Sequence, residues 1–490
     1  MTAAPSTDPA TGPTTDRATR STTGPGGPVR RNRRYTPLDA DGPLPADMVR
    51  AVPAIRRDPL AWLERTVERY GDMVAFPMPR SAVLLVNDPD GARQVLVEHA
   101  RDFGKATIQY GALSAVTGEG LLTADGDTWR HRRRIAQPAF HHGALHAVAD
   151  QASAAAAALR TRWDAAPGGV LDADEAALRT MLEVVGHTLF AADLGPVGER
   201  VVAAVDAALL AVILRARSPL PSSWPTPSAI RLRRAVHTLD EVCLDVVRRR
   251  RAAGVGDGDT DVLALLLRSA GPQGALSDRQ VRDELVTLVI AGHETVASCL
   301  TWTLHLLAGH PDVQDRVAAE LDDVLRGRGT PGAAWADLPA LTYTRAVVDE
   351  ALRLYPPAWV VTRRALADHD IAGVRVPAGS LVILSPWLLH RRAASWPDPQ
   401  RFDPDRFLPG GAAAGASRGP ARGDYVPFGA GPRLCIGRDM ALVQATLILA
   451  GLLPGRRVLP AGPRGAGPVR VDALVTLRPR GGLPLRLAPG

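Results

Sequence analysis

A cysteine set among glycines just before a predicted helix is the most chemically distinctive feature of the 490-residue chain. The segment reads Phe428-Gly-Ala-Gly431-Pro-Arg433-Leu-Cys435-Ile-Gly437. Glycines let the backbone approach another group closely, and the amide groups and dipole at a helix N-terminus favour a thiolate. A thiolate held in this way can serve as an axial ligand of heme iron. The alternative for a lone cysteine is a buried structural thiol, and only the flanking pattern argues against it.

A second chemical pattern, Ala-Gly-His-Glu-Thr at residues 291–295, lies inside a long helix predicted over 278–308. Glycine and threonine are poor helix formers, so their presence inside a helix indicates a packing or functional role. A hydroxyl at Thr295 beside a carboxyl at Glu294 can relay protons where water is excluded. The structural alternative is a threonine bonded to the preceding turn and a glycine that eases packing. For His293 we expect a packing or solvent-facing position.

Two further pairs have helical spacing. Glu350 and Arg353 are three residues apart and can pair on one helix face, which in most proteins would be an ordinary surface ion pair. Trp129 and Arg133 are four apart in a run rich in arginine, whose default interpretation is a solvated basic face.

Taken in their order along the chain, these patterns resemble the motifs of the cytochrome P450 family. The cysteine segment matches Phe-x-x-Gly-x-Arg-x-Cys-x-Gly at every fixed position, and Glu350-x-x-Arg353 matches the family's Glu-x-x-Arg. Residues 402–407 are similar to the segment that supplies Arg406, although Asp405 stands where the family usually has Glu. The motifs span about 129–437, and we place residues 1–57 outside the resemblance.

The resemblance implies heme b as cofactor, dioxygen as co-substrate, and a role for each matching residue. Cys435 would bind the iron, Thr295 would relay protons, and Glu294 would supply them. Glu350, Arg353 and Arg406 would form a buried network that retains the heme. The remaining cofactor-binding residues would be those against the heme propionates (Trp129, Arg133, Arg363 and Arg433), those on the oxygen side (Ala291 and Gly292), and those shaping the cysteine loop (Phe428, Gly431 and Gly437).

The activity implied is a monooxygenase that inserts one oxygen atom into a C–H or C=C bond. No nucleotide-binding glycine fingerprint or flavin or ferredoxin module is visible. We therefore expect electrons from NAD(P)H to arrive through separate proteins, a ferredoxin with its reductase or a flavodoxin-type donor, docked near Arg130 and Arg134. Alternatives are a peroxide-driven hydroxylase or decarboxylase, which tends to lack the acid–threonine pair, and a non-catalytic heme or ligand-binding protein.

By the same resemblance, the substrate pocket is mostly apolar and predicts a small hydrophobic substrate, as in secondary-metabolite biosynthesis. Arg215 and Arg217 could meet a polar end of it. The lining would come from residues 108–116, 205–230, Ala291, 360–361 and the C-terminal turn at 480–482.

The elements that must position these groups are mainly helical. Periodicity predicts one large α+β domain over 35–490, mainly α with small peripheral β-sheets, after a disordered tail at 1–34. Helices are expected at 59–70, 89–100, 144–163, 175–191, 201–216, 228–252, 260–269, 278–308, 311–326 and 437–453. Strands are expected at 73–77, 82–87, 371–376 and 381–384, with a connector at 219–227 and an insert at 410–423.

Charge and composition restrict the partners and the location. The net charge is +7 from 58 basic and 51 acidic residues, and the tail carries six arginines against two aspartates. A body this close to neutrality does not suit nucleic acid. Without an apolar leader, or a run of the roughly 18 apolar residues that a membrane span needs, we expect a cytoplasmic protein with no membrane anchor, acting as a monomer.

Overall fold

The computed structural model describes residues 36–490 except 79–81, 191–194, 217–223, 225, 257, 260, 272–273, 328–331, 414–422 and 463–468. The predicted tail at 1–34, most of the connector at 219–227 and most of the insert at 410–423 lie outside the described residues.

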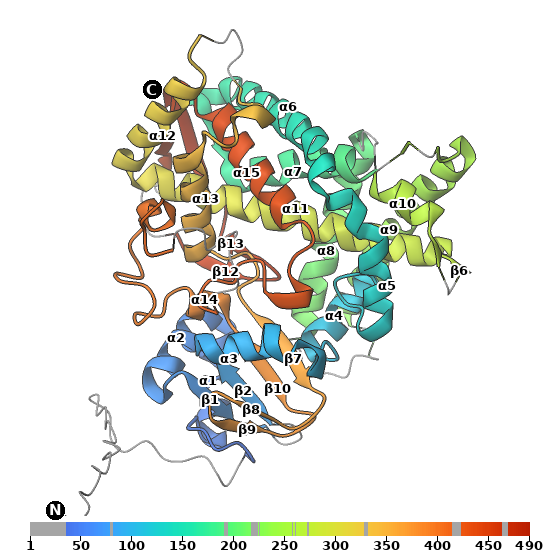
Figure 1. The fold of residues 1–490 in the computed structure, drawn as a ribbon, viewed down its shortest axis with the longest axis vertical. Coiled ribbons are helices and arrows are strands. Elements are labelled where there is room, and N and C mark those ends of the chain that lie inside the picture. The colour runs from blue at the N-terminus through green and yellow to red at the C-terminus, as the bar shows by residue number, and fades with distance from the viewer. Residues whose placement is uncertain are drawn as a thin grey trace, which may run out of the picture.

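The described chain is mainly helical with small sheets, as the sequence predicts. Figure 1 shows the helices gathered around α11, while the largest sheet lies at one end beside α1, α2 and α3. The helices are α1 (Pro45–Arg57), α2 (Pro59–Tyr70), α3 (Pro89–Arg93), α4 (Ile108–Thr117), α5 (Gly126–Ala136), α6 (Leu145–Asp164), α7 (Ala173–Phe190), α8 (Gly195–Ala216), α9 (Pro227–Ala253), α10 (Val262–Arg268), α11 (Asp278–Gly309), α12 (Pro311–Val324), α13 (Thr342–Leu354), α14 (Pro386–Leu389) and α15 (Arg438–Leu452).

Helix α11 is the centre of the fold. It begins with a capping box, in which Ser277 Oγ accepts the Gln280 N–H and the Gln280 side chain accepts the Ser277 N–H. Its first half packs in a core with α4, α8, α9 and α10, and its second half packs in another core with α6, α7, α13 and α15. Sequence alone predicted no membrane-length apolar segment, yet α11 has the length and hydropathy of one. Because 83% of its most apolar window is buried within the protein, α11 is a core helix.

The largest sheet has the strand order β1-β2-β10-β7-β3. Its strands are β1 (Met73–Phe76), β2 (Val83–Val86), β10 (Leu381–Leu384), β7 (Val361–Ala365) and β3 (Phe103–Gly104). The two strands expected at 73–77 and 82–87 pair with each other antiparallel, Met73 opposite Val86, and β10 joins β2 in parallel. In this sheet β3 pairs antiparallel with β7, Phe103 opposite Ala365 and Gly104 opposite Arg364.

The remaining strands form small sheets at the periphery. They are β4 (Val170–Asp172), β5 (Ala270–Gly271), β6 (Gly274–Ala275), β8 (His369–Ile371), β9 (Val374–Val376), β11 (Arg456–Pro460), β12 (Val471–Ala473), β13 (Leu477–Pro479) and β14 (Pro484–Pro489). The single strand predicted at 371–376 is wrong. A turn with positive φ at Ala372 and Gly373 divides it, so β8 and β9 form a hairpin.

Two helical predictions also need correction. The helix expected over 89–100 is α3 followed by a π-helix at Gln94–Glu98 and a 3₁₀ turn at Ala100–Asp102. Helix α1 was not expected because it contains Pro53 and buries none of its residues, so it lacks the apolar periodicity on which such predictions rest.

Candidate active site

Tight backbone packing fixes the cysteine loop. Gly431 has φ +65°, and a Cβ there would lie 2.1 Å from the carbonyl oxygen of Leu96, so only glycine fits without displacing backbone. The Cys435 N–H donates to the Phe428 carbonyl at 3.0 Å. Arg133 Nη1 donates to the Leu434 carbonyl at 2.8 Å, which ties α5 to the loop. The loop is held from both ends immediately before α15.

From its surroundings we infer an enclosed space beside the Cys435 thiol, which we call the hollow. Its surface is exposed, yet the protein around it raises the pKa of the thiol mainly through loss of hydration. Both observations hold for a side chain that faces an enclosed space. A hydrogen bond with the Gly437 backbone and the nearby charge of Arg133 act in the opposite direction and lower the pKa. A cation in the hollow would complete the stabilisation of a thiolate, and this suits a heme iron.

Helix α11 has one open stretch along its buried length. Between Val281 and Leu304 every residue is buried except Ala291, Gly292 and Thr295. Their spacing of one and four places them on one face of the helix. The Thr295 hydroxyl donates to the Ala291 carbonyl at 2.5 Å, the back-bond that was the structural alternative for this threonine. A Cβ on Gly292 would lie 3.3 Å from Val185 Cγ2, so this glycine also permits α7 to pack closely.

The neighbouring Glu294 is buried and points to a different set of groups. Its Oε2 accepts a hydrogen bond from Thr476 Oγ1 at 3.3 Å. Burial raises its pKa to about 7, and the charge of Arg478 partly offsets this. No hydrogen bond joins Glu294 to Thr295 within the described chain. Sequence reasoning missed Thr476 and Arg478, because no local pattern links the C-terminal turn to α11.

His293 is a packing residue and does not face solvent. Its Nε2 lies 2.9 Å from the Leu178 carbonyl oxygen, and burial lowers the pKa of the ring to about 4.

Four cations gather beside the cysteine loop. Arg433 donates to the Ala124 carbonyl at 2.9 Å, pairs with Asp125 and lies 4.0 Å over the Trp129 ring. Burial lowers its pKa to about 10, although Asp125 opposes this. Arg363, on β7, donates to the Tyr110 hydroxyl at 3.2 Å.

The fourth cation, Lys105, was not predicted to belong to the site. Its ammonium donates to the Leu122 carbonyl at 2.7 Å and lies 4.7 Å over the Tyr110 ring. Burial, and then the charges of Arg363 and Arg433, hold its pKa well below the usual 10.5. As the only lysine in the chain, it could have been singled out by sequence. The cations Arg133, Arg363, Arg433 and Lys105 exceed the one carboxylate, Asp125, and this excess suits a group bearing two carboxylates.

Glu350, Arg353 and Arg406 are brought together as the sequence suggested. Arg353 Nε and Nη2 each lie 2.7 Å from a Glu350 carboxylate oxygen, and both side chains are fully buried. Arg406 Nε lies 3.4 Å from Glu350 Oε1. The Asp403 N–H donates to the same carboxylate at 3.0 Å. Asp405, the departure from the family pattern, instead pairs with Arg316 on the surface at 2.7 Å.

The other two cysteines and several residues singled out from the sequence lie apart from this cluster. Cys243 and Cys299 are buried, and burial raises the pKa of each thiol to about 12. Arg130 and Arg134 are exposed on α5, as expected. Ile108, in the predicted pocket segment, is 75% exposed, and this outward position differs from the expected lining. The side chain of Arg215 and all of Arg217 lie outside the described residues.

A cysteine loop with an exposed thiol, a cluster of cations beside that loop and a central helix with an open stretch fit the class of heme-thiolate proteins. The residues present suit the iron, the flat macrocycle and the two carboxylates of heme b.

Comparison with known proteins specifies the family. The family model described as "Cytochrome P450" matches residues 42–461. Relatives include the cyclooctat-9-en-7-ol 5-monooxygenase of Streptomyces melanosporofaciens, 34% identical over 87% of this chain and 91% of its own. The pentalenene oxygenase of Streptomyces avermitilis is 35% identical over 82% of this chain and 87% of its own. The crystal structure of the cytochrome P450DA heme domain has a TM-score of 0.77 at 25% identity, covering 88% and 93% of the two chains.

The chain belongs to the cytochrome P450 family and is a P450 monooxygenase, an oxidoreductase. The family model begins at residue 42, so the placement of all of residues 1–57 outside the resemblance was wrong for residues 42–57. Helix α1 and the strand-contacting segment before it lie in that stretch. Gly42, for example, packs so closely that a Cβ would lie 1.9 Å from the Ala75 carbonyl oxygen.

Proposed function

We propose that this chain binds heme b through Cys435 Sγ and oxygenates a mostly apolar cyclic molecule at a C–H or C=C bond. Two observations carry the proposal. The Cys435 thiol has an exposed surface although protein surrounds it, and α11 has an open stretch at Ala291, Gly292 and Thr295. When bound, heme b supplies the iron at which dioxygen is reduced and one oxygen atom is transferred. Phe428 and Gly431 hold the cysteine loop, the Gly437 backbone forms a hydrogen bond with the Cys435 thiol, and Ala291 and Gly292 leave room beside α11.

The basic cluster fixes the orientation of the cofactor. Arg133, Arg363, Arg433 and Lys105 bind the two carboxylates, and Trp129 supports Arg433 through its ring. Anions here restore the pKa of Lys105, which burial and its cationic neighbours otherwise lower. The buried Glu350–Arg353–Arg406 network holds α13 against residues 399–406 and thereby supports the loop from behind.

Thr295 and Glu294 hold the protons that the reaction consumes. Thr295 keeps its hydroxyl at the open face of α11 through its bond to the Ala291 carbonyl. Glu294, with a pKa raised to about 7 by burial, is neutral and ionised in comparable amounts near neutral pH, so it can both accept and release a proton. Rotation of the Thr295 hydroxyl away from Ala291 would be needed for the relay.

The names of the relatives indicate a class of substrate for this enzyme. The names of the two Streptomyces relatives specify an alkenol and an alkene, and a third relative is named cyclooctatin synthase, 33% identical over 91% of this chain. We infer an apolar, terpene-like cyclic substrate from secondary metabolism. Electrons from NAD(P)H reach the enzyme through a separate ferredoxin or flavodoxin-type donor, for which the exposed Arg130 and Arg134 offer positive charge. We place the enzyme in the cytoplasm as a monomer.

The ligand assignment is tested with Cys435→Ala. The variant should lose the strongly red-shifted absorption band of the reduced carbon monoxide complex, because that band requires a thiolate at the iron. Cys299→Ala is the matched control, since it removes a buried thiol that faces no cofactor and should leave the band intact. An unchanged band in Cys435→Ala would remove Cys435 as the ligand.

The proton relay is tested with Thr295→Ala. The variant should consume NAD(P)H with less product and more released peroxide. Unchanged coupling would contradict the relay. If peroxide alone supports turnover, and at the same rate in the wild type and in Thr295→Ala, the peroxide-driven alternative is favoured.

A further inference from the structure

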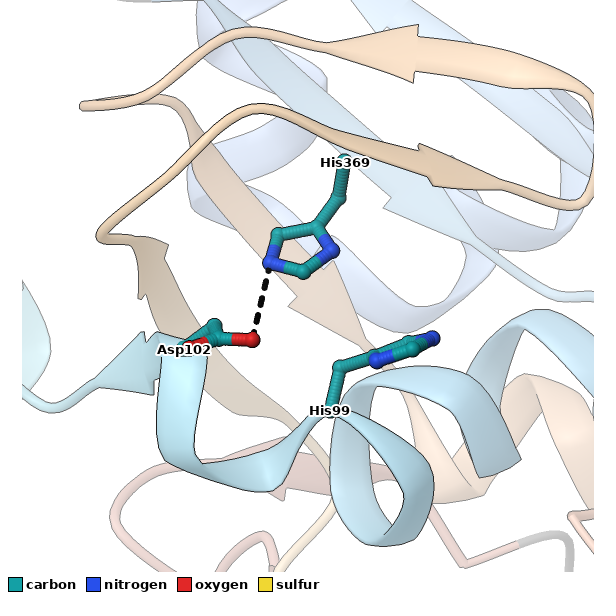
Figure 2. Close-up of side chains that lie close together, drawn as sticks. All are labelled: His99, Asp102 and His369. Atoms are coloured by element: carbon teal, nitrogen blue, oxygen red, sulfur yellow. Dashed lines mark ion pairs between the residues drawn. The ribbon is translucent and has the colours of Figure 1, made fainter.

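Two histidines and an aspartate that have no role in the proposed heme site lie together near the surface. Figure 2 shows His369 pointing toward Asp102, with which it pairs, and the His99 side chain beside them. Their nearest ligand atoms all lie within 4.8 Å of one another. We propose that these three side chains form a binding site for a divalent transition metal ion, specifically Zn²⁺.

The backbone brings the three residues together. The Asp102 N–H donates to the His99 carbonyl at 2.8 Å, which closes a 3₁₀ turn. In such a turn side chains three residues apart lie on the same side, so His99 and Asp102 share a face. His369 comes from the start of β8. The Leu366 N–H donates to the Asp102 carbonyl at 2.8 Å, beside the register of Phe103 with Ala365.

A second contact fixes the hairpin that carries His369. The Ala372 N–H donates to Gln94 Oε1 at 3.0 Å, which ties the β8–β9 turn to the π-helix before His99. The His369 ring also packs at 5.0 Å from the Phe103 ring and at 5.1 Å from the His99 ring, centre to centre. The site is therefore partly organised in advance, with His99 as its exposed and adjustable member.

The donor set and its spacing suit zinc. His369 Nε2 lies 3.2 Å from Asp102 Oδ2, and ligand atoms at ~2.0–2.1 Å from a tetrahedral Zn²⁺ are themselves separated by ~3.3 Å. His369 Nε2 is buried and makes no hydrogen bond within the described chain, so a metal would satisfy it. Imidazole and carboxylate ligands favour zinc and similar transition ions over calcium or magnesium. Three protein ligands leave a fourth position for water.

Neighbouring charged groups do not compete for the ion. Glu98 pairs with Arg93, and Asp368 is occupied by Arg375 at 3.2 Å and by the Ala378 N–H at 2.9 Å. The proposed ion would clamp the β8–β9 hairpin to the segment that leads into β3, and through β3 to Lys105.

The test is calorimetric titration of the heme-loaded, untagged protein with ZnCl₂ in a buffer that does not chelate metals. Loaded heme occupies Cys435, while Cys243 and Cys299 are buried, so thiols do not contribute. We expect one zinc bound per chain, with affinity lowered at least tenfold in His99→Gln and in Asp102→Asn. His99→Gln changes an exposed side chain and should leave the heme spectrum unaltered.

His146→Gln is the matched control. His142 and His146 form another exposed histidine pair, with His142 edge-on and His146 tilted against the Trp335 ring, and this variant should bind zinc as the wild type does. Absence of zinc binding by the wild type would overturn the proposal, as would equal affinity in wild type and His99→Gln. Loss of binding in the control alone would place the zinc elsewhere and would also overturn it.

Discussion

Replacing Glu350 by glutamine tests whether burial, rather than distance, determines the strength of an ion pair in this fold. Glu350 and Arg353 are fully buried with a shortest N–O distance of 2.7 Å. Glu350→Gln keeps the shape of the side chain, removes its charge, and leaves the Arg353 guanidinium buried without a counter-ion. Arg353 retains only its bonds to carbonyl groups, such as that of Pro399 at 2.7 Å. Removing one partner of a buried pair costs about 3–5 kcal/mol.

The expected shift in melting temperature follows from the size of the protein. An unfolding entropy of ~2.1 cal/mol/K per residue over a domain of roughly 450 residues gives about 0.9 kcal/mol/K. A loss of about 3–5 kcal/mol therefore lowers Tm by about 3–5 °C. The measurement is thermal unfolding followed by far-UV circular dichroism, with heme content measured on the same samples.

Asp405→Asn is the matched control. Asp405 lies one residue before Arg406 and pairs with Arg316 at the same shortest distance, 2.7 Å, but the two side chains are 50% and 54% exposed. An exposed pair contributes about 0–1 kcal/mol, so this variant should lower Tm by about 1 °C or less. Equal shifts in Glu350→Gln and Asp405→Asn would refute the reasoning.

Two further substitutions address the site. Burial raises the pKa of Glu294 from 4.5 to about 7, so its stabilising neutral form is fully present below pH 4.5 and lost as pH rises through 7. Glu294→Gln is uncharged at every pH, so its Tm should rise relative to that of the wild type as the pH increases from 5 to 8. Parallel plots of Tm against pH for the two proteins would contradict this. Gly431→Ala should lose heme and stability, because its Cβ would meet the Leu96 carbonyl at 2.1 Å. Gly437→Ala meets only the Phe140 ring, at 3.6 Å, and should unfold at the wild-type temperature; the reverse order of stabilities would exclude this account of the loop.

Local sequence patterns predicted most of the chemically important groups of this protein. The cysteine segment and the helical spacing of Glu350 and Arg353 depend on neighbours within ten residues, and so does the 291–295 stretch of α11. Most of the helices were predicted for the same reason, since helical periodicity is a local property. Two of the failed predictions arose where local patterns mislead: α1 contains a proline, and residues 371–376 look like one strand although a turn divides them.

Only the tertiary structure could assemble the groups that come from distant segments. Lys105 joins Arg363 and Arg433 through the pairing of β3 with β7 and the contacts of the cysteine loop, and Glu294 meets Thr476 across 182 positions of the chain. The pKa values follow from that assembly, because loss of hydration depends on which distant side chains cover a group. The same holds for the His99–Asp102–His369 cluster. Sequence determined which reactive groups the protein has, while folding decided which of them meet and how much water remains around them.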